Sequence, residues 1–385
     1  MDRDRSSFFV AIVVVDVLAG LADAVSGPYV VLFLVDHVGL GPLLLSAILT
    51  VRAVSGIAFG AAFGAWIDKR TSVAPLLLAL GGSALGYGLL AFTTNFALLL
   101  VIAAVPIAIG SAAFSQSIAL VKRNFVRESL YTANRAIGVM RASWSLAWAF
   151  GPAIGAAVVA VFGFRGVFLT SAAAAAAGLT TLALVRLRPD TSDLGHAIPR
   201  KAPNGRGAIP LAFASLTLFH TGMFMGSIPL AIVLTTSLGG AQSDVGWAYS
   251  LCAALEIVIM GALVWRPLKR GERNAIVAGF AVFAAYFVAM ALARSVAAVL
   301  WAQVLRAVAI ALVSYLGISF LQSLMPHRAG AAAALFSNAG QLGSVLSALG
   351  AGLLAHQFGY ASIFVACAVL SAGGLVLVCL VRSEP

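Results

Sequence analysis

The sequence predicts an all-α membrane protein whose twelve transmembrane helices form two six-helix bundles related by pseudo-symmetry. Of its 385 residues, 62% are hydrophobic and 10% are charged, and the mean hydropathy is +1.04. Such a composition leaves too little polar surface for a soluble globule. A helix that crosses the hydrocarbon core needs about 20 residues, most of them apolar. The predicted spans are residues 8–35, 42–67, 73–92, 97–120, 133–161, 165–187, 209–236, 244–266, 273–292, 297–323, 329–355 and 360–381.

The connecting segments alternate between rich and poor in Lys and Arg, and this alternation predicts the orientation. With a cytoplasmic N-terminus, 19 of the 24 basic residues lie in cytoplasmic segments and two, Arg165 and Arg294, lie in outer loops. Basic residues concentrate on the cytoplasmic side of membrane proteins, so we expect both termini in the cytoplasm. The pattern accounts for most of the net charge of +11 and adds attraction to anionic lipid. It therefore gives no reason to expect a nucleic acid partner.

The first span has an alternative interpretation as a secretory signal, because Arg3 and Arg5 precede an apolar run. Its removal would invert the charge asymmetry of every later loop, which disfavours that interpretation. The three cysteines, Cys252, Cys367 and Cys379, all fall inside predicted spans. They indicate neither a disulfide framework nor a metal site, and no cofactor is expected.

One long polar stretch divides the chain into two halves. Residues 188–208 contain prolines, glycines and mixed charge without an apolar period, and they predict a linker in the cytoplasm. The predicted domains are therefore a bundle at 1–187, the linker at 188–208 and a second bundle at 209–385. The end of the fifth span, VFGFRGVF at 161–168, resembles the end of the eleventh, HQFGYASIF at 356–364. Two related six-helix halves with a site near the bilayer midplane are typical of secondary transporters.

Several charged residues lie well inside the predicted spans. A charge at the bilayer centre costs about 2.5–3.5 kcal/mol, so these groups must face a cavity or one another. Asp16 and Asp23 are seven residues apart and share a helix face. Asp23 and Glu256 are the candidates for carrying a proton, and the alternative for each charge is a fixed ion pair between helices. The predicted network of proton-coupling or buried charges consists of Asp16, Asp23, Arg52, Glu256 and Arg306.

The fifth span offers the richest candidate binding surface. Arg141, Trp144 and Trp148 share one helix face, which places a planar set of donors beside two indole rings. Sugars bind this combination well, because their C–H faces lie on aromatic rings while their hydroxyls need polar partners. The alternative is that the tryptophans only pack or lie at a membrane interface. The complete predicted substrate-binding set is Gln116, Arg141, Trp144, Trp148, His220, Asn338 and Gln341, with a helix-to-helix hydrogen bond as the alternative role for His220.

Two loops carry a motif that resembles the major facilitator superfamily. The sequence GAWIDKR at 64–70 matches the pattern Gly-x-x-x-Asp-Arg/Lys between the second and third helices of that superfamily, and the equivalent loop of the second half keeps part of it. The resemblance implies a major facilitator fold. We expect these residues to form a cytoplasmic latch that changes partners between two states. The predicted latch residues are Gly64, Asp68, Lys69, Arg70, Lys269, Gly271 and Arg273.

Three further segments resemble the bacterial sugar efflux transporter family: SLAWAFGP at 145–152, AALEI at 253–257 and LQSLMPHRAGAAAALFSN at 321–338. Together they extend the resemblance over nearly the whole chain. One departure is the serine, Ser227, that stands before Pro229 in the seventh span, where family members tend to carry an acidic residue.

The resemblance implies a secondary transporter, not an enzyme, that exports small sugars or glycosides by alternating access in exchange for protons. Its expected location is the bacterial inner membrane, and its expected partners are a small solute, protons and lipid, with a monomeric chain. The alternative within transport is a proton-coupled exporter of drugs or other small molecules. A membrane enzyme or receptor-like scaffold is disfavoured, because the chain lacks His-Glu-x-x-His and phosphate-loop motifs.

Overall fold

The computed structural model describes residues 3–69, 72–125, 130–184, 207–266, 271–325 and 329–381, and these are almost entirely helical. Nine helical stretches in this described part are long and apolar enough to cross a membrane. The all-α prediction is confirmed for these residues. The predicted linker lies outside them, apart from Gly207 and Ala208.

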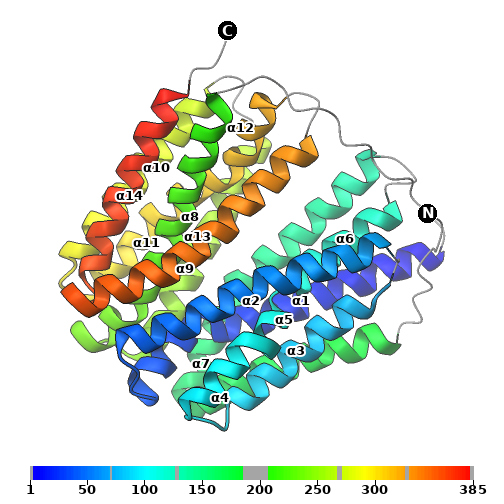
Figure 1. Ribbon diagram of the computed structural model, residues 1–385, viewed down its shortest axis with the longest axis horizontal. Coiled ribbons are helices and arrows are strands. Elements are labelled where there is room, and N and C mark those ends of the chain that lie inside the picture. The colour runs from blue at the N-terminus through cyan, green and yellow to red at the C-terminus, as the bar shows by residue number, and fades with distance from the viewer. Residues whose placement is uncertain are drawn as a thin grey trace. The chain divides into compact units, whose positions relative to one another are not determined.

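The first half of the chain forms a series of long helices joined by short connections (Figure 1). Its elements are α1 (Arg3–Leu32), the π-helical turn η1 (Phe33–His37), α2 (Pro42–Lys69), α3 (Ala74–Leu90), α4 (Phe96–Ile102), η2 (Ala103–Ile107), α5 (Ala108–Gly110), α6 (Ala113–Phe125) and α7 (Leu130–Leu184).

The second half repeats this order. Its elements are α8 (Ala208–Ile232), η3 (Val233–Ser237), α9 (Gln242–Trp265), α10 (Glu272–Leu292), α11 (Val296–Ile310), η4 (Ala311–Tyr315), α12 (Leu316–Leu324), α13 (Ala329–Phe358) and α14 (Ser362–Leu380).

Helix boundaries follow from local capping chemistry, and corresponding caps recur in both halves. The Asn95 side chain accepts a hydrogen bond from the Leu98 amide at 3.1 Å and begins α4. The Ser295 hydroxyl accepts one from the Ala298 amide at 3.2 Å and begins α11. Each cap satisfies an amide that has no partner within its own helix.

The predicted internal repeat has a structural counterpart at the glycines that end helices. Gly163 and Gly359 have φ of 62° and 78°, and they occupy matching positions in the two sequence segments that resemble each other. Glycine adopts this left-handed conformation without the steric cost that a side chain brings. The π-helical turns also recur, with η1 and η3 ending the first helix of each half. Both halves therefore share a backbone plan.

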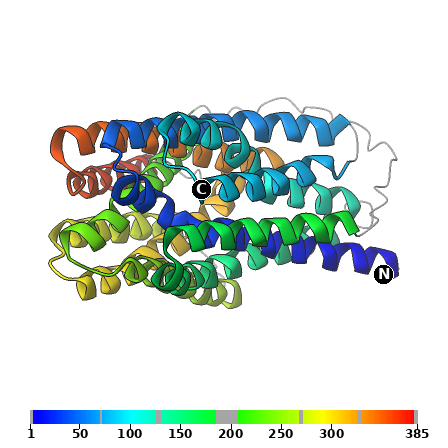
Figure 2. The same ribbon diagram turned by 90° about the horizontal axis from the view of Figure 1, so that it is seen from below.

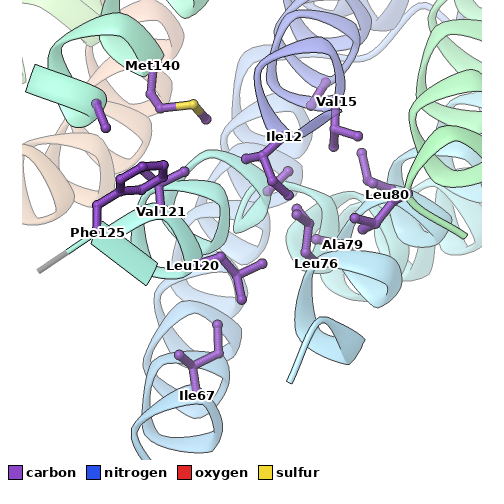
Figure 3. Packing of buried hydrophobic residues seen from close by; sticks show 14 residues of the cluster. Ile12, Val15, Ile67, Leu76, Ala79, Leu80, Leu120, Val121, Phe125 and Met140 are labelled. Atoms are coloured by element: carbon purple, nitrogen blue, oxygen red, sulfur yellow. The ribbon is translucent and has the colours of Figure 1, made fainter. Parts of the chain in front are cut away.

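The chain divides into two compact units: Met1–Gly39 with Ile48–Gly195, and Leu40–Ala47 with His196–Pro385. In the first unit α1 packs along α7, and the two helices lie side by side (Figure 2). Apolar side chains from five helices meet in one cluster of this unit (Figure 3). Members of this cluster include Ile12 and Val15 of α1, Ile67 of α2, Leu76 and Leu80 of α3, Leu120 and Phe125 of α6, and Met140 of α7.

Two places in the predicted spans have non-helical backbone. The fifth and sixth predicted spans are two helices under the one label α7, and the break predicted between them falls at Gly163, whose φ of 62° is not helical. The fourth predicted span consists of α4, η2, α5 and α6, with a turn at Ser111 and Ala112. A residue periodicity of 3.6 does not reveal such turns, because their sequences are as apolar as their surroundings. The number of twelve spans and the boundaries of the predicted domains stay predictions.

Candidate functional site

The two predicted tryptophans lie on the face of α7 that packs against α1. Gly20 lies against Trp144, since a Cβ placed on that glycine would be 3.2 Å from the indole. Gly27 lies against Trp148 in the same way, also at 3.2 Å. The Trp144 ring also contacts Phe114 of α6, with 4.7 Å between ring centroids. Each indole is half-buried, so one part of the ring packs between helices and another part stays accessible.

Arg141 lies one turn before Trp144 on α7, and its side chain is exposed. Among the described residues no carboxylate oxygen lies within 4.0 Å of its guanidinium. Its donors are therefore not used in an ion pair within the described part of the chain. The role of Arg141, Trp144 and Trp148 in binding a solute stays a prediction.

Asp23, Arg52 and Tyr87 come together inside the first unit, from α1, α2 and α3. The guanidinium Nη2 of Arg52 lies 3.6 Å from Oδ1 of Asp23, and both side chains are about one-third exposed, at 32% and 34%. The Tyr87 hydroxyl donates to the same carboxylate oxygen at 3.0 Å. Asp23 therefore has one cationic and one hydroxyl partner on two other helices. Tyr87 could not be predicted from the sequence, because a single tyrosine in an apolar helix carries no distinguishing signal.

Asp16 lies two turns before Asp23 on α1 and has quite different surroundings. Its side chain is 0% exposed, and neither of its carboxyl oxygens has a hydrogen-bond partner in the described part of the chain. Gln116 of α6 is also buried: its Nε2 donates to the Ser115 hydroxyl at 3.3 Å, and its Oε1 has no described partner. The two carboxyl groups of α1 therefore occupy chemically opposite environments.

The second unit holds a buried cation. Arg306 of α11 is 6% exposed and donates from Nη2 to the Ser227 hydroxyl at 2.7 Å. Its guanidinium also lies over the Tyr249 ring at 5.0 Å from the centroid, a favourable cation–π arrangement. The Tyr249 hydroxyl donates in turn to the Ser227 carbonyl at 3.0 Å. The serine that departs from the family pattern is therefore the residue that binds this arginine.

Glu256 lies two turns after Tyr249 on α9, in the same unit as Arg306. No ion pair within 4.0 Å joins these two residues. The Nη1 of Arg306 and the Oε1 of Gln303 are buried without a described hydrogen-bond partner. The second unit thus contains an arginine whose charge is only partly compensated. The sequence did not single out Gln303 in advance. Its position three residues before Arg306, on the same helix face, is the signal that could have identified it.

His220, Asn338 and Gln341 lie on the packed pair α8 and α13. His220 is buried, and its Nδ1 donates to the carbonyl of Leu216 on its own helix at 2.8 Å. Its ring also packs against Phe336 of α13, at 5.1 Å between centroids. Asn338 and Gln341 are both exposed on α13, three residues apart. Their amide groups remain available, and their role in binding stays a prediction.

The predicted latch residues of the second half include one clear helix contact. Arg273, at the start of α10, donates from Nε to the Val378 carbonyl at 3.1 Å and from Nη2 to the Cys379 carbonyl. Both acceptors lie in the last turn of α14, where a cation is favourable next to unpaired carbonyls. Gly271 precedes α10 with φ of 97°, a conformation suited to glycine.

The remaining predicted latch residues are Gly64, Asp68, Lys69, Arg70 and Lys269. Gly64 is half-buried, and a Cβ at this position would meet no described atom within 4 Å. Lys69 is exposed in the last turn of α2, and the Asp68 side chain is not described. Arg70 and Lys269 lie outside the described residues. Their function as a latch stays a prediction.

Long apolar helices that carry charged side chains in their interior indicate a multi-pass membrane protein, and this arrangement is typical of transporters. The sequence pattern of the Major Facilitator Superfamily matches residues 12–215 and 211–385. The chain belongs to this superfamily. The predictions of a major facilitator fold and of a transporter instead of an enzyme are thereby confirmed.

Two bacterial relatives are similar over almost the whole chain. The "Putative sugar efflux transporter" of Deinococcus radiodurans is 36% identical over 94% of this chain and 95% of its own length. The "Sugar efflux transporter A" of Escherichia coli K12 is 27% identical over 99% of this chain and 98% of its own. The predicted likeness to sugar efflux transporters is confirmed.

Solved structures show the same fold at low sequence identity. A bacterial homologue of the human lysosomal transporter Spinster, in an inward-facing and occupied conformation, superimposes with a TM-score of 0.79. The two sequences are 13% identical, and the match covers 100% of each chain. A transporter of the POT family in complex with 5-aminolevulinic acid has a TM-score of 0.76 over 97% of this chain and 95% of its own, at 14% identity.

Proposed function

We propose that this transporter exports small sugars or glycosides from the cytoplasm by alternating access, in exchange for protons. The observation that carries the proposal is the 36% identity with the Deinococcus radiodurans protein, which extends over almost all of both chains. The proposed location is a bacterial inner membrane, with both termini in the cytoplasm and a monomeric chain. Residues 1–187 and 209–385 act as the two moving bundles, joined by the linker at 188–208.

The chemistry of the predicted binding residues supports a sugar as the solute. Arg141 offers a planar set of donors whose hydrogen bonds are not taken up by a carboxylate, next to the accessible parts of Trp144 and Trp148. Asn338 and Gln341 offer donors and acceptors three residues apart, a spacing that suits two neighbouring hydroxyls. Aromatic faces and polar groups are the two kinds of surface that a sugar ring needs.

The test is counterflow in proteoliposomes loaded with one sugar at a time from a panel of mono- and disaccharides. The expected result is saturable exchange of at least one sugar by the parent. Arg141→Ala lowers that exchange about tenfold or more, because a hydrogen bond from a charged donor contributes roughly 1.5–3 kcal/mol. Arg165→Ala is the matched control, since this arginine lies over the Phe92 ring at 4.4 Å and away from the predicted binding residues.

A second measurement addresses coupling. A pH-sensitive dye inside inverted vesicles reports whether sugar entry into the vesicle is accompanied by proton exit. Exchange of a lipophilic cation without exchange of any sugar would contradict the proposal and favour a drug exporter. Sugar exchange that is indifferent to the pH gradient would contradict the antiport mechanism alone.

A further inference from the structure

We propose that Asp16, and not Asp23, is the residue of the N-terminal half that takes up and releases the transported proton. This inference rests on the proposed exchange of a solute for protons. It starts from the contrast between two carboxyl groups on one helix, which are equivalent in sequence and opposite in their surroundings.

Asp23 already has the partners that keep a carboxylate charged. Arg52 lies at 3.6 Å and the Tyr87 hydroxyl donates at 3.0 Å, both to Oδ1. A proton that binds to this carboxylate has to break a favourable ion pair. Asp23 is therefore suited to hold α1, α2 and α3 together through their charges.

Within the described part of the chain, Asp16 has no partner that stabilises a negative charge. It is completely buried, and no described group donates a hydrogen bond to either carboxyl oxygen. Its neighbours on α1, Ile12, Val15 and Ala19, belong to the apolar cluster of the first unit. An ionised carboxylate in such a place is strongly unfavourable, and a neutral carboxylic acid is far less so. The conformation described here is therefore the one in which Asp16 holds its proton.

Among the described residues, the elements packed against α1 bring no charge to Asp16. Gly20 of α1 contacts Trp144 and Ala147 of α7. Asp16 lies one turn before Gly20, so the part of α7 nearest to Asp16 is the turn that precedes Trp144. That turn contains Arg141, whose side chain is exposed.

The described charged and titratable groups on the other helices around α1 are exposed or paired elsewhere. Lys122 is exposed on the last turn of α6, and Arg52 of α2 pairs with Asp23, as does Tyr87 of α3 through its hydroxyl. Among described residues, no basic nitrogen lies within 4.0 Å of the Asp16 carboxyl.

The burial of Asp16 couples its protonation to conformation. Release of the proton requires water or a cation to reach the carboxyl, and this requires the packing of α1 against its neighbours to open. The proton is held when the contact is closed and lost when it is open, which is the property that a coupling residue needs. The transfer is a simple exchange of one proton between the Asp16 carboxyl and water.

The first test compares Asp16→Asn with Asp23→Asn in the same proteoliposomes. Asparagine has nearly the shape of the neutral acid, so Asp16→Asn is expected to keep sugar counterflow while its sugar transport no longer responds to a pH gradient. Asp23→Asn disturbs the ion pair and lowers stability, yet the transport that remains still responds to the gradient. A normal response to the gradient in Asp16→Asn, or its selective loss in Asp23→Asn, overturns the inference.

The second test needs no substrate. Infrared spectroscopy of the purified protein at neutral pH detects the C=O stretch of a protonated carboxyl group. The parent and Asp23→Asn are expected to show a buried-acid band that Asp16→Asn lacks, and an unchanged band in Asp16→Asn overturns the inference. If the parent transports no sugar, the proposed function fails, and the infrared comparison still decides the protonation of Asp16.

Discussion

The close approach of α1 and α7 predicts that Gly155→Ala destabilises the first unit. A Cβ at position 155 would lie 2.6 Å from Cε2 of Tyr29 and 2.6 Å from the Val25 carbonyl oxygen. Normal carbon–carbon contact begins at about 3.5 Å, so the side chain falls roughly 0.9 Å short of the space it needs. The tyrosine ring cannot give way, because it is completely buried and its hydroxyl donates to the Pro152 carbonyl at 3.4 Å. The helices must separate, and overpacking of this kind costs about 1–3 kcal/mol.

The assay is reversible unfolding of the purified protein in detergent, followed by circular dichroism. Gly60→Ala is the matched control, because a Cβ at Gly60 would meet no described atom within 4 Å. Both substitutions improve intrinsic helix propensity by about 0.8–1.0 kcal/mol, so their difference isolates the packing cost. We expect Gly155→Ala to be the less stable by about 1–3 kcal/mol. Equal stability of the two variants would refute the argument that Gly155 exists to let Tyr29 pack.

Three further substitutions test contacts of single side chains. Tyr87→Phe removes the hydroxyl that donates to Asp23 and is expected to lower the free energy of unfolding in detergent by about 0.6–1.7 kcal/mol. The same change in an Asp23→Asn background should have a smaller effect. Arg273→Gln removes the cation at the last turn of α14 and should lower the free energy of unfolding by about 0.3–1 kcal/mol. An unchanged free energy of unfolding would contradict a stabilising role for this contact. Ser227→Ala leaves Arg306 without its hydroxyl acceptor and should cost roughly 1–3 kcal/mol, whereas Ser227→Thr, which keeps the hydroxyl, should stay near the parent in thermal unfolding.

Much of the fold follows from sequence because an apolar surrounding leaves the backbone few options. Hydropathy identified helices at the predicted positions, and the likeness between residues 161–168 and 356–364 identified Gly163 and Gly359 as equivalent helix ends. The structure added what hydropathy cannot detect. The π-helical turns η1 to η4 share no sequence pattern that would have predicted them, and neither does the turn at Ser111 and Ala112.

The candidate site was predictable in its residue types and much less in its pairings. Buried charges signal their presence through their cost, so Asp23, Arg52 and Arg306 could be named in advance. Their partners could not, because Tyr87 and Ser227 are ordinary residues until the helices bring them within hydrogen-bonding distance. Sequence spacing also treated Asp16 and Asp23 as members of one helix face, although packing gives them opposite environments.

The π-helical turns have a consequence for any residue-by-residue mapping of this transporter. Each such turn inserts an extra residue, so side chains beyond it are rotated by about 100° relative to an uninterrupted helix. In the segment 296–324, where η4 separates α11 from α12, a cysteine scan interpreted with one helical wheel would place side chains after Ala311 on the wrong face of the helix. The labelling patterns of α11 and α12 will each match a helix only when the rotation of the helical wheel is fitted separately for each of them.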